Sequence, residues 1–187
     1  MRLAGQRFLG STFAKIFIIL IVATNTARAQ GKNPVVEARL VCATDAVHAD
    51  APARVAMVAQ VAAGYHLNDH KPTLNYLIPT KFVAEPSEQF TVKNVIYPPG
   101  TPMKFVFSDV PLSVYQGKLV VGVLLQAAKT VPPGTYTLRG KFAYQACSDH
   151  ACLAPTSVPV TATLKVVAKN VPLNMVESDV FKRIKFE

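Results

Sequence analysis

Two cysteines near the end of the chain are the residues whose type and spacing are best suited to chemistry. Cys147 and Cys152 lie five positions apart, between two segments in which apolar and polar residues alternate as they do in β-strands. If these strands pair, one cysteine ends the first strand and the other opens the second, so that their Cα atoms approach to the ~5–6 Å typical of a disulfide. In an oxidising compartment we expect the two to form a bridge.

Such a bridge has three interpretations on residue chemistry alone. A structural disulfide is the simplest, but closing a loop of about six residues restrains the unfolded chain by only about 2 kcal/mol, against nearly 5 kcal/mol for about a hundred residues. A redox-active pair at an exposed hairpin tip is therefore a fair candidate, although C-x4-C is a weak motif. Metal binding is the third, because reduced thiolates together with His150 between them suit copper or zinc. Protonated, His150 would instead lower the pKa of a neighbouring cysteine.

The first 29 residues have the pattern of a secretory signal peptide. Three basic residues precede an apolar run at 16–23, and Ala27-Arg28-Ala29 supplies the small residues that signal peptidase reads. The apolar run is far shorter than the ~20 residues of a membrane-spanning helix. We therefore expect export with cleavage near Ala29, and no transmembrane anchor in the mature chain.

The charge of the exported part gives no indication of nucleic-acid binding. The leader holds four of the 20 basic residues and none of the 11 acidic residues, so the remaining chain carries a net charge of +5. Its basic residues are scattered singly, apart from a small cluster at 182–185, whereas nucleic-acid-binding proteins gather such charge on one helix or stripe.

The exported part is predicted to be all-β. All 14 prolines lie beyond the leader, and they leave no window in which a helix shows its 3.6-residue apolar period. Between them lie strand-like runs at 35–42, 54–63, 76–83, 90–97, 104–107, 118–127, 135–147 and 158–167. The last two alternate strictly, as expected for antiparallel strands with one face on a core. Many short strands separated by turns favour an antiparallel β-sandwich or barrel, which we place at residues 30–169.

Residues 170–187 lose this alternation and are expected to form a short C-terminal tail. Without a regular apolar face to bury, the tail should be the first segment cleaved in limited proteolysis. The third cysteine, Cys42, lies in an apolar stretch about a hundred residues before the pair. A thiol in such a place is usually a small buried hydrophobic group, and we expect it to be inert in exchange reactions.

Several short motifs together resemble one known family. They are Gly64-Tyr65-His66-Leu67-Asn68, Tyr115-Gln116-Gly117, Tyr144-Gln145-Ala146-Cys147, and Cys152-Leu153-Ala154-Pro155 followed by Val158-Pro159-Val160. Over roughly residues 34–168 this combination is similar to the periplasmic N-terminal domain of the thiol:disulfide interchange protein DsbD.

The resemblance implies an immunoglobulin-like antiparallel β-sandwich in the periplasm, with Cys147 and Cys152 as its redox pair and no cofactor. It implies a thioredoxin-fold or membrane thiol reductant as electron donor, and oxidised periplasmic thiol proteins as acceptors. In the family the second cysteine forms the mixed disulfide with partners, which here is Cys152. The surroundings of Cys152 favour its exposure independently, because Pro155 discourages regular strand pairing.

The chain also departs from the family pattern. It has four residues between its cysteines, where the family member that compares best has five. That domain covers its disulfide with an aromatic cap loop flanked by acidic residues, and the corresponding segment here offers Phe107 as the cap and Asp109 as its acid. Four further residues are candidates for the wall of the site: Tyr65, His66, Tyr144 and His150.

Overall fold

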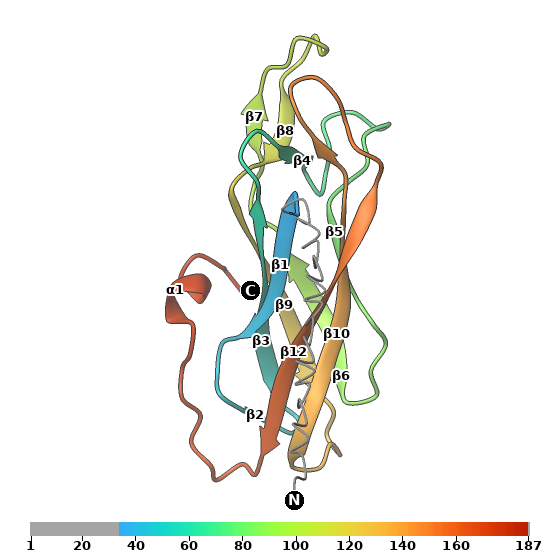
Figure 1. The fold of residues 1–187 in the computed structure, drawn as a ribbon. Helices are drawn as coiled ribbons and strands as arrows, with labels where there is room; N and C mark the ends of the chain where they lie inside the picture. The colour runs from blue at the N-terminus through green and yellow to red at the C-terminus, as the bar shows by residue number, and fades with distance from the viewer. Residues whose placement is uncertain (1–33, 187) are drawn as a thin grey trace, which may run out of the picture. The chain divides into compact units, whose positions relative to one another are not determined.

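Two sheets pack face to face around the main hydrophobic core (Figure 1). The computed structural model describes residues 34–186, so the predicted leader lies outside the described residues. The first sheet contains, in spatial order, β1 (Val36–Cys42), β3 (Pro52–Val61), β9 (Lys118–Ala127) and β6 (Phe90–Ile96). The second contains β2 (Val47–His48), β12 (Thr156–Val167), β10 (Gly134–Tyr144) and β5 (Lys81–Ala84). Within the described chain these strands pair antiparallel except β2 with β12, which confirms the predicted immunoglobulin-like sandwich.

The pair β10–β12 illustrates how the sequence pattern produces a sheet. The two strands pair along the whole of β10, from Gly134 opposite Val166 to Tyr144 opposite Thr156. Every second residue points into the core, and Phe142 is completely buried there. Because burying one such side chain contributes about 1.5–3 kcal/mol, this alternation fixes which face of the sheet turns inward. The predicted period of two is confirmed in both strands.

A third, small sheet continues the molecule beyond one end of the sandwich, at the top of Figure 1. Its strands are, in spatial order, β11 (Ala146–Cys147), β4 (His66–Asn68), β8 (Leu112–Tyr115) and β7 (Thr101–Met103). The chain leaves β10 at Tyr144 and enters β11 at Ala146, so the run predicted as one strand at 135–147 is divided between two sheets. Three of the motifs that carry the family resemblance begin or end in β4, β8 and β11, and the last, from Cys152 to Val160, runs into β12.

Two predicted strands differ from the structure. The run at 104–107 is not a strand, because β7 ends at Met103 and the chain then forms a loop up to β8. The run at 76–83 is extended only in β5, since Pro79 has no N–H to donate to a ladder. Just before that proline, the Ile78 carbonyl accepts a hydrogen bond from the Asn68 side-chain amide (3.0 Å).

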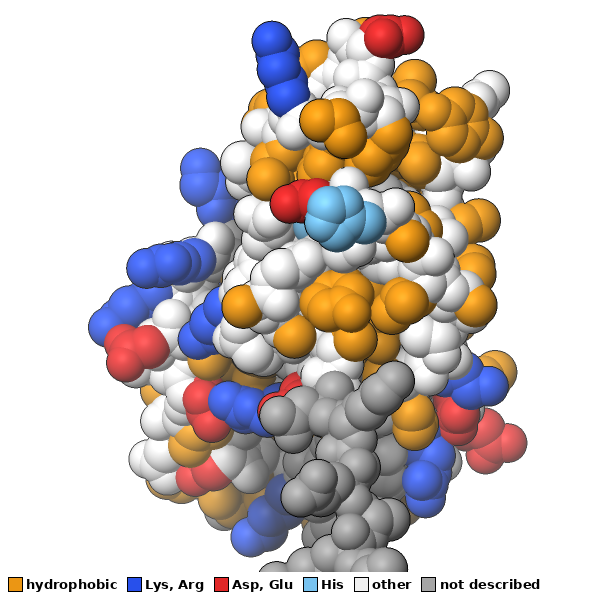
Figure 2. Space-filling view, turned by 45° about the horizontal axis from the view of Figure 1, so that its top comes forward, with side chains coloured by type: hydrophobic (Ala, Val, Ile, Leu, Met, Phe, Trp, Pro, Cys, Tyr) orange, Lys and Arg blue, Asp and Glu red, His pale blue; other side chains and the backbone are white. Residues whose placement is uncertain are grey.

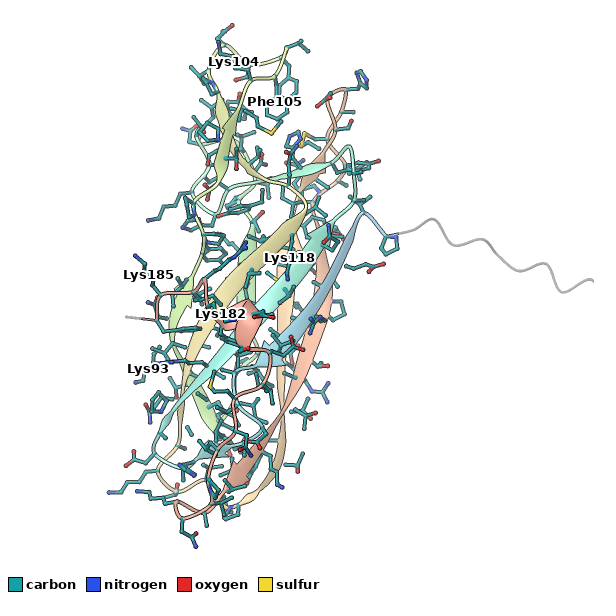
Figure 3. All side chains as sticks on the ribbon, turned by 90° about the vertical axis from the view of Figure 1, so that its left-hand side faces the viewer. Lys93, Lys104, Phe105, Lys118, Lys182 and Lys185 are labelled. Carbon is teal, nitrogen blue, oxygen red and sulfur yellow. A yellow bond between two sulfur atoms is a disulfide. The ribbon has the colours of Figure 1, made fainter. Side chains whose placement is uncertain are left out.

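The C-terminal segment packs part of its residues on the outer face of the first sheet, although it lacks the regular apolar alternation of a strand. A short helix, α1 (Ser178–Phe181), buries Val180 and Phe181 against Ala56 and Val58 of β3. The apolar run of β3 explains this, because alternate residues face the main core and the residues between them would otherwise lie in water. Figure 3 shows Lys182 beside α1, close to the strands of this sheet.

A buried carboxylate connects the third sheet to the loops around it. Asp69 follows β4 directly and is 6% exposed. It accepts hydrogen bonds from Ser113 Oγ (2.6 Å), Tyr115 OH (2.8 Å), Gly100 N (3.1 Å) and Lys71 N (3.1 Å), and its Oδ1 lies 2.6 Å from His70 Nδ1. Burial opposes ionisation of this carboxyl, but the hydrogen bonds outweigh that effect and lower its pKa to about 2.

We expect Asp69→Asn to destabilise the fold, because an amide nitrogen would face groups that donate hydrogen bonds. The loss at neutral pH should be on the order of 2 kcal/mol of unfolding free energy. In the wild-type chain the folded-state pKa lies below the ordinary value of 3.8, so the contribution of Asp69 is present above about pH 4 and disappears as the pH falls towards 2. Urea unfolding of both proteins across this range measures the effect. The exposed Asp109→Asn serves as control, and an unchanged neutral-pH midpoint for Asp69→Asn would contradict the prediction.

We expect Phe181→Ala to lower the unfolding free energy by about 3 kcal/mol, because it removes most of a buried ring and leaves a cavity over β3. Leu173→Ala, at a position 36% exposed in the same segment, should change it by less than about 0.5 kcal/mol. Chemical denaturation measures both variants. If they have equal stability, the packing of α1 contributes nothing to the fold.

Candidate functional site

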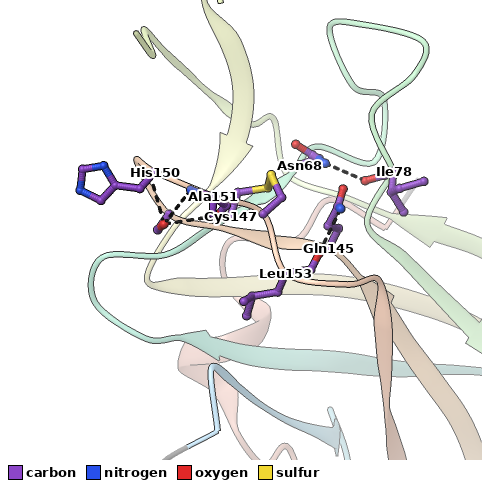
Figure 4. Close-up of a disulfide and its surroundings, with 9 residues drawn as sticks. Asn68, Ile78, Gln145, Cys147, His150, Ala151 and Leu153 are labelled. Atoms are coloured by element: carbon purple, nitrogen blue, oxygen red, sulfur yellow. Dashed lines mark hydrogen bonds between the residues drawn. A yellow bond between two sulfur atoms is a disulfide. The ribbon is translucent and has the colours of Figure 1, made fainter. Parts of the chain in front are cut away.

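Cys147 and Cys152 form a disulfide across a short β-hairpin (Figure 4). Backbone hydrogen bonds flank the pair on both sides, from Leu153 N to Ala146 O (2.8 Å) and from Ser148 N to Ala151 O (2.9 Å). The cysteines are therefore a directly opposed, non-hydrogen-bonded pair, the position at which antiparallel chains approach most closely. This explains why their Cα atoms are 3.9 Å apart, closer than the separation expected from the sequence.

The hairpin turn is held by the side chain of Ser148. Its Oγ accepts hydrogen bonds from the backbone amides of His150 (3.3 Å) and Ala151 (3.2 Å). This arrangement leaves Asp149 and His150 exposed at the tip. The His150 ring points away from the disulfide in Figure 4. The structure therefore does not bring this histidine, a candidate for the site wall, to the sulfur atoms.

The two cysteines differ strongly in exposure. Cys147 is 2% exposed, because β11 lies between β4 on one side and the returning hairpin strand on the other. Cys152 is exposed, as its sequence context predicted. An attacking thiolate from solvent can therefore reach the Cys152 sulfur more easily than the Cys147 sulfur.

His66 is the histidine that the fold brings to the pair. It lies directly opposite Cys147 in the β4–β11 ladder and is 2% exposed. Burial lowers the pKa of its imidazole, and the negative charge of Asp149 partly offsets this effect. Asp149 was not among the residues that the sequence singled out, because only the hairpin turn brings its charge near His66.

The ring that covers His66 belongs to Phe105, not to the predicted cap residue Phe107. The Phe105 and His66 rings are 4.4 Å apart, and Phe105 is buried. Phe107 stacks on Phe105 (5.2 Å between ring centroids) and is 54% exposed. Figure 3 places Phe105 at the end of the molecule that carries the third sheet. The predicted acid of the cap, Asp109, lies exposed in the same loop.

The two tyrosines predicted at the wall of the site pack elsewhere. Tyr144 is buried at the end of β10, with its ring 5.4 Å from that of Phe142, and burial raises the pKa of its hydroxyl. Tyr65 is half-buried in the turn before β4 and contacts the main core. Both are next to site residues in the sequence, but the contacts that the structure gives them belong to the sandwich.

Exposed apolar side chains surround the disulfide end of the molecule (Figure 2). They come from the β7–β8 loop, the loop before β5 and the hairpin itself, and they are Tyr76, Ile78, Val106, Phe107, Val110 and Leu153. We call this set the apolar rim. Exposed large apolar side chains gathered at one end of a molecule often mark a protein-interaction site.

The sequence raises the questions of a metal site and of a membrane-spanning helix. Within residues 34–186, no three His, Cys, Asp or Glu side chains are grouped so that they could hold a metal ion. The same part of the chain has no helix long and apolar enough to cross a membrane.

Comparison with solved structures finds several similar domains, and the three described here have low sequence identity. The N-terminal periplasmic domain of ScsB from Proteus mirabilis is 14% identical with a TM-score of 0.49, over 69% of this chain and 46% of that one. The reduced N-terminal domain of DsbD from Neisseria meningitidis is 16% identical with a TM-score of 0.37, over 72% and 89%. The complex of the DsbD and PilB N-terminal domains from the same organism contains a chain that is 19% identical, with a TM-score of 0.37. The match covers 64% of this chain and 79% of that one. The chain thus spans about half the length of the ScsB chain.

Comparison with curated proteins found no match. A family model does match: that of the N-terminal region of the thiol:disulfide interchange protein DsbD, over residues 34–164. The matched region contains the sandwich apart from the end of β12, together with the third sheet and both bridged cysteines. The chain therefore belongs to the family of DsbD N-terminal domains.

Proposed function

We propose that this domain exchanges its Cys147–Cys152 disulfide with thiol proteins in the periplasm. The observation that carries the proposal is the asymmetry of the bridge, in which the exposed residue Cys152 is bonded to the buried residue Cys147. Family membership and the signal-peptide pattern of residues 1–29 support the chemistry and the compartment respectively.

The exchange proceeds in two steps, each of which replaces one sulfur–sulfur bond by another. A donor thiolate attacks Cys152 Sγ, the bridge breaks, and Cys147 leaves as a thiolate that takes up a proton. The second donor thiol then loses its proton and attacks the donor sulfur of the mixed disulfide, which releases Cys152 as a thiolate that also takes up a proton. Two electrons and two protons have then passed to the domain, and the reverse sequence passes them to an oxidised acceptor.

Thiol proteins are the proposed partners on both sides of this transfer. The donor is a thioredoxin-fold protein or a membrane thiol reductant, and the acceptors are oxidised periplasmic thiol proteins. The apolar rim around Cys152 supports a protein rather than a small thiol as partner, because it offers surface that a partner can bury. The DsbD N-terminal domain of Neisseria meningitidis forms a complex with the N-terminal domain of PilB, which is consistent with partners of this kind.

The competing function is that of an interaction module whose disulfide is purely structural. The buried Cys147 favours this alternative, because a sulfur packed inside a sheet stabilises the hairpin whether or not it reacts. Trapping of reaction intermediates distinguishes the two functions.

We expect Cys147→Ser to trap a covalent complex through Cys152 when the reduced variant is mixed with an oxidised thioredoxin-fold protein. The exposed sulfur can attack, but no second thiol remains to resolve the mixed disulfide. Cys152→Ser should trap at least about tenfold less, because the remaining thiol is buried. Non-reducing gel electrophoresis measures the yields. Equal trapping would overturn the assignment of roles, and no trapping by either variant would favour the structural disulfide.

We expect Cys42→Ser to leave the reduction potential of the pair unchanged and to lower stability modestly, by about 1 kcal/mol. Cys42 is half-buried at the end of β1, and burial raises the pKa of its thiol, so little thiolate is present. Equilibration with glutathione buffers measures the potential. A shift in that potential, or rapid labelling of native Cys42 by a thiol reagent, would contradict this prediction.

A further inference from the structure

His66, Cys147 and Cys152 form a row across three neighbouring strand segments. Cys147 is directly opposite His66 on one side and directly opposite Cys152 on the other. Directly opposed residues of antiparallel strands project from the same face, with Cβ atoms about 4.5–5.5 Å apart. The imidazole therefore extends from the same face as both sulfurs, next to the buried one.

The His66 imidazole is also free to exchange a proton. The ring is almost completely buried under Phe105, yet among residues 34–186 neither of its nitrogens makes a hydrogen bond to another side chain or to the backbone. The neighbouring His70 differs, because its Nδ1 lies within hydrogen-bond distance of both Asp69 and Tyr115. No fully shielded side-chain nitrogen lacks a partner among the described residues, so the His66 ring keeps a slight opening to water through which a proton can be exchanged.

Cys147 needs help to lose its proton, whereas Cys152 does not. To close the bridge again, Cys147 must become a thiolate and attack Cys152 Sγ. Burial in apolar surroundings disfavours the thiolate, whereas Cys152 can ionise in contact with solvent. A proton acceptor is therefore required at Cys147 specifically.

We infer that His66 is the proton acceptor and donor for Cys147 in the exchange reaction. This inference rests on the proposed function. In the closing step the Cys147 thiol passes its proton to the imidazole, the thiolate attacks Cys152 Sγ, and the partner leaves as a thiolate that is then protonated. In the opening step the imidazolium returns a proton to Cys147 as it leaves.

The electrostatic surroundings suit this role. Burial favours the neutral imidazole, which is the form that accepts a proton, and Asp149 stabilises the imidazolium once it has formed. The other titratable groups on the elements around His66 lie exposed or are engaged elsewhere: Lys104 and Asp109 on the β7–β8 loop, Lys118 at the start of β9, Asp69 and His70 beyond β4, Tyr115 on β8, and His150 at the hairpin tip.

The test uses 5,5′-dithiobis(2-nitrobenzoate), which needs no protein partner, and a Cys42→Ala background. Attack by Cys152 on this reagent releases one thionitrobenzoate and leaves the other attached, and attack by Cys147 on Cys152 Sγ then releases the second. Stopped-flow absorbance separates the two releases. We expect His66→Phe, which keeps a ring under Phe105, to slow the second release at neutral pH by on the order of tenfold or more. The rate of the first release should stay within about twofold of that of the protein with His66. The difference in the second rate should shrink as the pH rises, because hydroxide then removes the Cys147 proton.

Two further variants make the result decisive. His66→Gln keeps a polar side chain without a base and should behave like His66→Phe, so it carries the test if the larger ring disturbs the fold. His150→Gln removes the histidine that points away from the sulfurs and should leave both releases unchanged. Equal second releases with the same pH profile in wild type and both His66 variants would overturn the role of His66 and leave the exchange function intact. A wild-type protein that releases no second thionitrobenzoate would overturn the exchange function itself, and this role with it.

Discussion

The pairing of β11 with β4 is the interaction on which the site depends. Because β4 occupies one side of this two-residue strand, the returning chain at Cys152 can pair only on the other side, where it forms the edge of the third sheet. A strand with neighbours on both sides buries its side chains more completely than an edge strand does. The difference in exposure between the two sulfurs follows directly from this order of strands, and no special surroundings for either cysteine are needed to explain it.

That pairing in turn depends on elements that contribute no reacting group. β4 is only three residues long and could not hold its position alone. Its C-terminal end is held by the Asp69 carboxylate, which accepts hydrogen bonds from donors in three separate segments of the chain. Above it, Phe105 closes the exposed side of His66. The loop that supplies Phe105 lies between the strands β7 and β8, so the sheet that positions the cysteines also positions the ring over His66.

The sequence was sufficient to predict the sandwich and the bridge but not the surroundings of the bridge. Strict alternation in β10 and β12 defines a buried face, and two cysteines on either side of a hairpin turn are brought together by that turn. Both features therefore depend on residues close together in the sequence. The sequence pointed to Phe107 as the cap, whereas Phe105 is the ring that packs on His66, because only the loop geometry decides which of the two turns inward. The docking of α1 could be read only from β3, whose apolar residues are too continuous for a sheet with one face in water.

The spacing of four residues between the cysteines has a physical consequence of its own. Ser148 and Ala151 form the pair next to the turn and are joined by a backbone hydrogen bond, so the cysteines occupy the next pair outward, which is not hydrogen-bonded. With only Asp149 and His150 between the Ser148–Ala151 pair, the cysteines are directly opposed, and directly opposed residues project from one face. Direct opposition also puts His66 in the same row, because the β4–β11 register continues the hairpin register without a shift. The C-x4-C motif is weak as a sequence signal, but in this hairpin it is what aligns the imidazole, the buried sulfur and the exposed sulfur.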